Sequence, residues 1–137
     1  MSDPKPPLAA ELLWTDGLKF GATSGRSAIM IDGDGGAGPS PMQLAAFALA
    51  GCMAADVVAI LKKGRHPLAG LRVSFRGDRA ASPPRRFERI TLHFHVSGAV
   101  PADAVGRAIS LSHETYCSVW HSMRPDIAFV TAFDIHP

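Results

Sequence analysis

The chain of 137 residues has little of several things that would assign it quickly to a class. Only two cysteines are present, which excludes a disulfide-dense scaffold. Neither sign of charge dominates, since 14 basic residues are balanced by 12 acidic ones, so bulk charge does not indicate a nucleic-acid partner. The opening MSDPKPPLAA lacks the basic flank and apolar run of a signal peptide. These absences predict a cytoplasmic protein with normally reduced cysteines and with no nucleic-acid or membrane partner.

What is present is enough apolar sequence for one compact domain. Hydrophobic residues make up 47% of the chain and charged residues 19%, which excludes a disordered protein. The length matches a single domain over residues 1–137, in which residues 1–8 form a loose, proline-rich lead-in.

The pattern of apolar residues predicts an α+β fold. Asp16-Gly17 lies between two apolar stretches and predicts a tight hairpin, and Arg26–Asp32 could form a third short strand. Alternation of apolar and polar residues predicts further strands over residues 71–75 and 90–96, and the turn at Arg124-Pro125-Asp126 leads into a last strand over 127–135. Helical spacing runs from Val105 to Met123, although the weak helix formers at 112–115 favour an interruption. The order strands, helix, strands, helix, strand is typical of α+β proteins.

The longest apolar stretch predicts a central core helix. Ser40 can cap its start and Gln43 can complete the capping box. Residues 44–61 are apolar on nearly every helical face, which is typical of a buried helix. Only Leu44–Ala55 is free of charge, well short of the roughly 20 residues that a membrane span needs. Lys62-Lys63-Gly64 then marks the end of the helix.

The two cysteines, Cys52 and Cys117, both fall in helical segments. Free cysteines are among the most buried residues, so both could simply be small core residues. The functional alternative is a redox pair, in which one thiolate becomes a sulfenic acid and the other thiol condenses with it to a disulfide. Because an apolar helix raises the pKa of a thiol, this chemistry requires a nearby cation. Arg26, at the start of the third predicted strand, is the best candidate.

Other polar clusters have simpler interpretations. His93 and His95 share one face of a strand and could begin a metal site, but no third ligand stands at a convincing spacing, so we expect a solvated face and no metal. His113, near Cys117, is expected on the surface of its helix. The glycine-rich run 33–38 matches no phosphate-binding or calcium-binding loop and predicts a flexible connector. Residues 62–89 hold nine of the basic residues, which we interpret as a solvated charged face.

Two motifs around the cysteines resemble the OsmC/Ohr family. The first runs from Pro39-Ser-Pro-Met-Gln-Leu to Ala50-Gly-Cys52 and continues with Asp56-Val-Val, and the second is Tyr116-Cys117-Ser-Val. The Lys-Lys-Gly after the helix is most similar to the YhfA-like branch of the family. The resemblance covers nearly the whole chain. It implies an OsmC-like fold, with antiparallel sheets around a long buried central helix, in an intertwined homodimer whose sites form at the subunit interface.

The resemblance also implies a peroxidase that acts on organic hydroperoxides without a cofactor. Cys52 would attack the distal peroxide oxygen, Cys117 would resolve the sulfenate, and an external dithiol would restore both thiols. Arg26 matches the arginine that stabilises the thiolate. The substrate side of the site would include Met42 and Gln43.

One departure from the family pattern bears on this activity. Ohr-type peroxidases carry a glutamate at the position of Met42, where it holds the arginine, and neutral Met42 and Gln43 cannot form that charge-assisted pair. Another carboxylate could substitute, such as Asp56 one turn after Cys52, or the activity is reduced. Asp56 could equally be a polar group bonded at a helix or dimer contact. The alternative function is therefore a non-catalytic protein that binds a small apolar ligand in the dimer-interface pocket.

Overall fold

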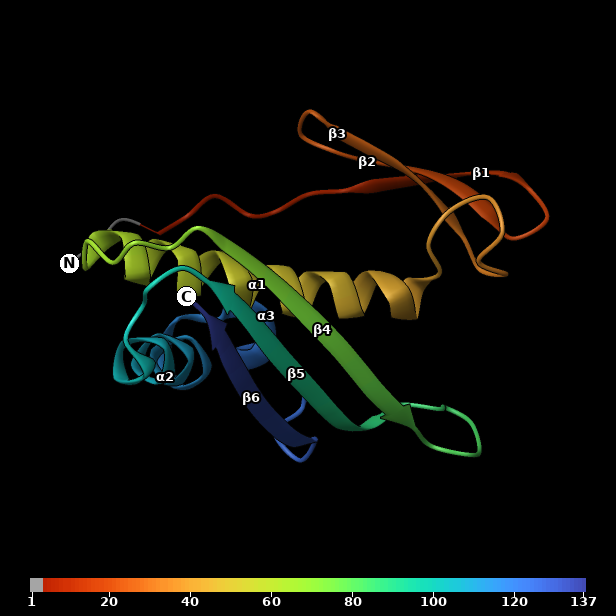
Figure 1. The fold of residues 1–137 in the computed structure, drawn as a ribbon. Helices are drawn as coiled ribbons and strands as arrows, with labels where there is room; N and C mark the ends of the chain where they lie inside the picture. The colour runs from red at the N-terminus through yellow and green to blue at the C-terminus, as the bar shows by residue number, and fades with distance from the viewer. Residues whose placement is uncertain (1–3) are drawn as a thin grey trace. The chain divides into compact units, whose positions relative to one another are not determined.

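The computed structural model describes residues 4–137 (Figure 1). Contacts between residues group the chain into two compact units, one ending at Ala45 and the other spanning Ala46–Pro137. Each unit contains one three-stranded sheet.

The sheet of the first unit consists of β1 (Glu11–Asp16), β2 (Lys19–Ser24) and β3 (Ser27–Asp32), paired antiparallel in that order. The predicted hairpin is confirmed: β1 ends at Asp16, and Gly17 has a φ of +53°, which glycine adopts without strain. Every residue of β1 is exposed. This sheet therefore buries little of its apolar surface within the chain.

The glycine-rich loop after β3 is more organised than the flexible connector that we expected. Asp32 is 3% exposed, and its carboxylate accepts hydrogen bonds from the backbone N–H groups of Asp34 and Ala37, both at 2.9 Å. The hydrogen bond from Ala37 is the largest cause that holds the pKa of Asp32 below its usual value. Composition alone does not show that one aspartate binds two N–H groups of the loop.

Helix α1 (Pro41–Lys63) begins and ends where the sequence predicts. The backbone N–H of Ser40 donates to Oε1 of Gln43 at 2.9 Å, and that of Gln43 donates to Oγ of Ser40 at 3.2 Å, so the capping box is confirmed. Burial differs from the expectation. One stripe is buried in the described chain, and it consists of Leu49, Met53, Val57 and Leu61. Phe47, by contrast, is 64% exposed, so the second unit by itself buries one side of α1 and leaves Phe47 uncovered.

By length and composition, α1 is apolar enough to cross a membrane, with a mean hydropathy of 2.2 in its most apolar stretch. Core helices of soluble proteins meet the same criterion. The regular buried stripe of α1, and the hydrogen bond that Asp56 accepts within the second unit, support the interpretation as a core helix.

The sheet of the second unit consists of β4 (Gly70–Arg79), β5 (Phe87–Ser97) and β6 (Ala128–His136). Strands β4 and β5 pair antiparallel, whereas β5 and β6 pair parallel. The sheet is thus mixed, which corrects the expectation of wholly antiparallel sheets. The reason is the helical crossover between β5 and β6, because a parallel pair needs such a connection.

The crossover contains α2 (Ala102–Leu111), a π-helical turn η1 (Ser112–Tyr116) and the short α3 (Ser118–His121). The predicted interruption of helical spacing is confirmed, since α2 gives way to η1 at Ser112. Within the second unit, Figure 1 shows α1 and α2 on one side of the sheet. The fully buried residues of β5 alternate along the strand, and they are Ile90, Leu92, Phe94 and Val96. They form the core beneath the helices, so the intervening side chains point to the opposite face.

Candidate active site

The second unit brings Cys52 and Cys117 together. Cys52 lies on α1 directly before buried Met53 and is itself half-buried, whereas Cys117 lies between η1 and α3 and is 0% exposed. The thiol of Cys52 lies near enough to Cys117 to raise the pKa of Cys117. The two cysteines that the sequence singles out therefore lie in one region of the second unit.

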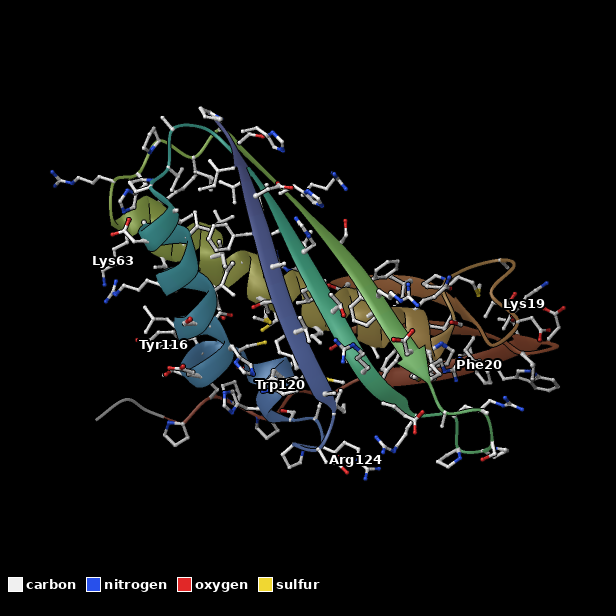
Figure 2. The ribbon with its side chains drawn as sticks, turned by 60° about the horizontal axis from the view of Figure 1, so that its bottom comes forward. Lys19, Phe20, Lys63, Tyr116, Trp120 and Arg124 are labelled. Atoms are coloured by element: carbon white, nitrogen blue, oxygen red, sulfur yellow. The ribbon has the colours of Figure 1, made fainter. Side chains whose placement is uncertain are left out.

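Local backbone structure fixes Cys117. Its N–H donates to the carbonyl of Ser112 at 2.8 Å, which closes the π-helical turn, and its Sγ accepts from the N–H of Trp120 at 3.4 Å at the start of α3. The rings of Trp120 and Phe129 stack 4.5 Å apart, and this contact ties the segment to β6. Figure 2 shows Tyr116 and Trp120 on this segment beside β6. Cys117 is thus held by both neighbouring helical turns.

The electrostatics of Cys117 favour the neutral thiol. Burial raises its pKa to about 11, and the hydrogen bond and charge of Cys52 act in the same direction. The N–H groups of Trp120 and Val119 oppose this shift without cancelling it. Cys117 therefore holds its proton at neutral pH, and Cys52 is the more accessible sulfur of the pair.

Asp56 is a bonded polar group, one of the two interpretations left open by the sequence. Its Oδ2 accepts a 2.7 Å hydrogen bond from Oγ of Ser112, a residue with 0% exposure. The bond joins α1, one turn after Cys52, to the turn that leads to Cys117. No sequence pattern indicates the role of Ser112, because that role depends on Asp56, a residue far away in the chain.

Two hollows lie near this region. One, of about 670 Å³, is lined by Asp56, Lys63, Arg107 and Tyr116 among others; Lys63 and Tyr116 are labelled in Figure 2. The other is an apolar groove of about 650 Å³ between α1 and β4, and its lining includes Phe47 and the neighbour of Cys52, Gly51. The lining of the groove has no charged residue, whereas that of the first hollow includes Asp56, Lys63 and Arg107.

The remaining predicted site residues belong to the first unit. Arg26 is exposed in the turn between β2 and β3, and Met42 is half-buried in the first turn of α1. Gln43 is exposed, and its side-chain oxygen is held in the capping box. The roles of Arg26, Met42 and Gln43 stay predictions.

The sequence missed two features of the histidines. His93 and His95 have an acidic neighbour, Asp134, which reaches them from β6. Asp134 alternates with apolar residues in a predicted strand, but only the parallel register of β6 reveals where it lies. His113 is not a free surface residue as expected, because its ring packs 4.9 Å from that of Phe129.

Comparison with known proteins places the chain among relatives of the same architecture. A family model described as OsmC-like protein matches residues 33–132. Protein YhfA of Escherichia coli K12 is 43% identical over 115 residues, which cover 82% of this chain and 86% of YhfA. A hypothetical protein from Aquifex aeolicus VF5 superposes with a TM-score of 0.90 at 25% identity, over 96% of this chain and 98% of that one. An organic hydroperoxide resistance protein OsmC from Legionella pneumophila shares the fold, with a TM-score of 0.72 at 16% identity over 96% and 99%.

The two three-stranded sheets, the long helix and the paired cysteines define a small α+β protein of the OsmC-like fold. The chain belongs to the OsmC-like protein family, which confirms the resemblance seen in its cysteine motifs.

Proposed function

We propose that the protein is a thiol-dependent peroxidase that reduces organic hydroperoxides in defence against oxidative stress. The supporting observation is the proximity of half-buried Cys52 to buried Cys117, whose pKa is raised to about 11. One sulfur is accessible to a substrate, and the other keeps its proton until a disulfide forms. The similar fold from Legionella pneumophila carries the name of an organic hydroperoxide resistance protein, which agrees with this substrate class.

The proposed reaction has three steps. The thiolate of Cys52 attacks the distal oxygen of the hydroperoxide, the O–O bond breaks, and the leaving alkoxide takes a proton to become an alcohol. The thiol of Cys117 then condenses with the sulfenic acid of Cys52, forming the S–S bond and releasing water. An external dithiol reduces this disulfide by exchange and is itself oxidised. We place the reaction in the cytoplasm, where such reductants are maintained.

Arg26 is assigned to the stabilisation of the Cys52 thiolate, because a thiolate on an apolar helix requires neighbouring positive charge. Met42 and Gln43 are assigned to the substrate side of the site. Met42 cannot hold a guanidinium through a charge-assisted hydrogen bond. The proposed peroxidase therefore works with a less constrained arginine than one that carries a glutamate at this position.

A homodimer is part of the proposal. Leu13 and Trp14 of β1 are 73% and 63% exposed, and Phe47 of α1 is 64% exposed. A small sheet whose first strand is wholly exposed gains little stability by itself, and exposed apolar patches of this kind are typical of protein interfaces. A second copy of the chain would cover them. Sedimentation equilibrium at several concentrations should give the mass of two chains, and a monomer throughout would refute this part.

The peroxidase is tested by turnover of tert-butyl or cumene hydroperoxide with dithiothreitol as the reductant. Cys52→Ser should abolish turnover. Cys117→Ser should still form a sulfenic acid at Cys52, which dimedone traps, but it should form no intramolecular disulfide. Ser118→Ala, at the exposed neighbour of Cys117, is the matched control. Turnover that survives in Cys52→Ser would refute the assignment.

A second function is favoured by the apolar groove of about 650 Å³ along α1. A non-catalytic protein could bind a small apolar ligand there. The presence of methionine instead of glutamate at position 42 agrees with this function. Native mass spectrometry of the purified protein would detect a retained ligand. A ligand found on protein that is inert towards hydroperoxides would favour this function over the peroxidase.

A further inference from the structure

We propose that His93, His95 and Asp134 form a binding site for a divalent transition-metal ion such as Zn²⁺, on the face of the second sheet that points away from its helices. The proposal is independent of the cysteine chemistry. Alternation along β5 directs its buried core residues towards the helices, so the two histidines lie on the other face.

The parallel register of β5 and β6 brings the three side chains together. His95 pairs with Asp134 across the two strands, and His93 precedes His95 by two residues on the same face. Nε2 of His93 lies 3.1 Å from Oδ2 of Asp134, and Nδ1 of His95 lies 3.3 Å from the same oxygen. One potential ligand atom from each residue lies within 4.8 Å of the others. The two imidazole rings stack with centroids 4.2 Å apart, so they present their edges side by side.

These donors suit a zinc-type ion. Imidazole nitrogen and carboxylate oxygen bind Zn²⁺ at about 2.0–2.1 Å, which in a tetrahedral site separates two ligand atoms by about 3.3 Å. The measured separations of 3.1 and 3.3 Å between carboxylate and imidazole atoms agree with that geometry. Two histidines and one carboxylate also favour a transition metal over Ca²⁺ or Mg²⁺, which prefer oxygen ligands.

The surroundings support metal binding at two further points. Oγ of Ser74 lies 3.2 Å from Nε2 of His95. In the tautomer in which Nε2–H donates to this oxygen, the lone pair of Nδ1 is directed towards Asp134. Outer hydrogen bonds orient zinc-bound histidines in the same way. Oδ1 of Asp134 is buried and has no hydrogen-bond partner among residues 4–137. Nε2 of His136 lies 3.3 Å from this oxygen without forming a hydrogen bond to it, so a third imidazole borders the cluster.

The site has features that limit its affinity. His93 and Asp134 are 36% and 42% exposed at their side chains, so water competes with the protein ligands. Arg72 pairs with His95 across β4 and β5, and its Nη1 donates to Ser74 at 3.2 Å, which places a positive charge on the same face. We therefore expect a site weaker than the closed tetrahedral sites that hold structural zinc.

The test is calorimetric titration of Zn²⁺ into the full, reduced chain near neutral pH, with circular dichroism to verify that each variant is folded. We expect one ion per chain, bound at least about tenfold more weakly by His95→Asn and by Asp134→Asn. Asp134→Asn preserves the shape of the side chain and removes only its negative charge. It therefore still tests the proposal if His95→Asn does not fold. His66→Asn, which changes a histidine outside the cluster, should bind as the unchanged chain does.

The two cysteines could also bind Zn²⁺, and cobalt separates the two cases. Co²⁺ bound by imidazole and carboxylate should show visible d–d absorption without the near-ultraviolet thiolate charge-transfer band. Three outcomes would each overturn the proposal. Zn²⁺ binding could be lost only when Cys52 and Cys117 are alkylated, Asp134→Asn could bind as strongly as the unchanged chain, or the chain could bind no Zn²⁺ at all.

Discussion

Oγ of Ser112 donates a 2.7 Å hydrogen bond to the carboxylate of Asp56, and this bond crosses between the two segments that carry the cysteines. Asp56 stands one turn after Cys52 on α1, and Ser112 begins the π-helical turn that ends just before Cys117. The carbonyl of Ser112 also accepts the N–H of Cys117. Ser112 therefore links the position of one sulfur to the helix of the other.

Ser112→Ala should destabilise the protein by about 1–3 kcal/mol, because the half-buried carboxylate of Asp56 loses its hydrogen-bond donor. Urea unfolding followed by circular dichroism measures the free energy of unfolding. Ser110→Ala, an exposed position on α2, should change it by less than about 0.5 kcal/mol. Equal effects of the two substitutions would mean that the bond to Asp56 contributes no stability.

The raised pKa of Cys117 predicts a stability that falls at high pH. The folded-state pKa of about 11 lies above the unfolded value of about 9, so the folded state favours the neutral thiol. Its contribution is complete below about pH 9 and is lost as the pH rises through about 11. Between these two pH values, the free energy of unfolding of Cys117→Ala should therefore decrease less than that of the unchanged chain. Identical pH profiles would contradict the shift.

The same shift predicts how Cys117 reacts. In Cys52→Ala the hydrogen bond and charge of Cys52 are gone, but burial, the largest cause of the raised pKa, remains. The pKa of Cys117 should fall below about 11 and stay above the ordinary value of 9.0. The pH dependence of alkylation by iodoacetamide, with the urea-unfolded variant as the control, gives this pKa directly. Rapid alkylation of the folded variant at neutral pH is the opposite outcome.

The elements were predictable to the extent that they depend on local sequence. Capping by Ser40 and Gln43 is local, and so are the hairpin at Gly17 and the alternation along β5. The parallel pairing of β6 is not local, because a strand with the same alternation could join the sheet in either direction. Burial of α1 could not be predicted either, since an all-round apolar helix does not reveal which side its own chain covers.

For the candidate site, the sequence identified the two cysteines but not their surroundings. The proximity of Cys52 to Cys117 followed from family motifs, whereas the bond from Ser112 to Asp56 depends on side chains far apart in the chain. The sequence did not indicate that Asp134 lies beside the two histidines, for the same reason. Its distance to His93 follows from the register of β5 and β6, and this register cannot be read from the residue spacing within either strand.

Met42→Glu should raise the peroxidase activity if Arg26 stabilises the Cys52 thiolate. A glutamate at this position could form the charge-assisted hydrogen bonds that methionine lacks, and such bonds fix a guanidinium in place. We expect kcat/KM for tert-butyl hydroperoxide to increase about tenfold, which corresponds to about 1.4 kcal/mol. In an Arg26→Met background the same substitution should bring no increase. A gain that persists without Arg26 would show that the glutamate acts through another group.

Gly98 and Gly106 should respond in opposite ways to alanine. Gly98 has a φ of +116°, and a Cβ there would meet the carbonyl oxygen of Pro67 and lie 2.9 Å from the backbone nitrogen of Ala69. Both the backbone conformation and the contact are unfavourable, so Gly98→Ala should cost about 1–3 kcal/mol. Gly106 lies within α2, where a Cβ would be 3.8 Å from the ring of Phe133, an ordinary contact.

Gly106→Ala should therefore stabilise the protein by about 1 kcal/mol, because glycine is the poorer helix former. Thermal unfolding should show a lower midpoint for Gly98→Ala and a higher one for Gly106→Ala, measured in the same buffer with both cysteines reduced. A higher midpoint for Gly98→Ala would mean that the loop before α2 can move away from Pro67 at little cost. A lower midpoint for Gly106→Ala would mean that α2 packs against β6 too closely for one added methyl group.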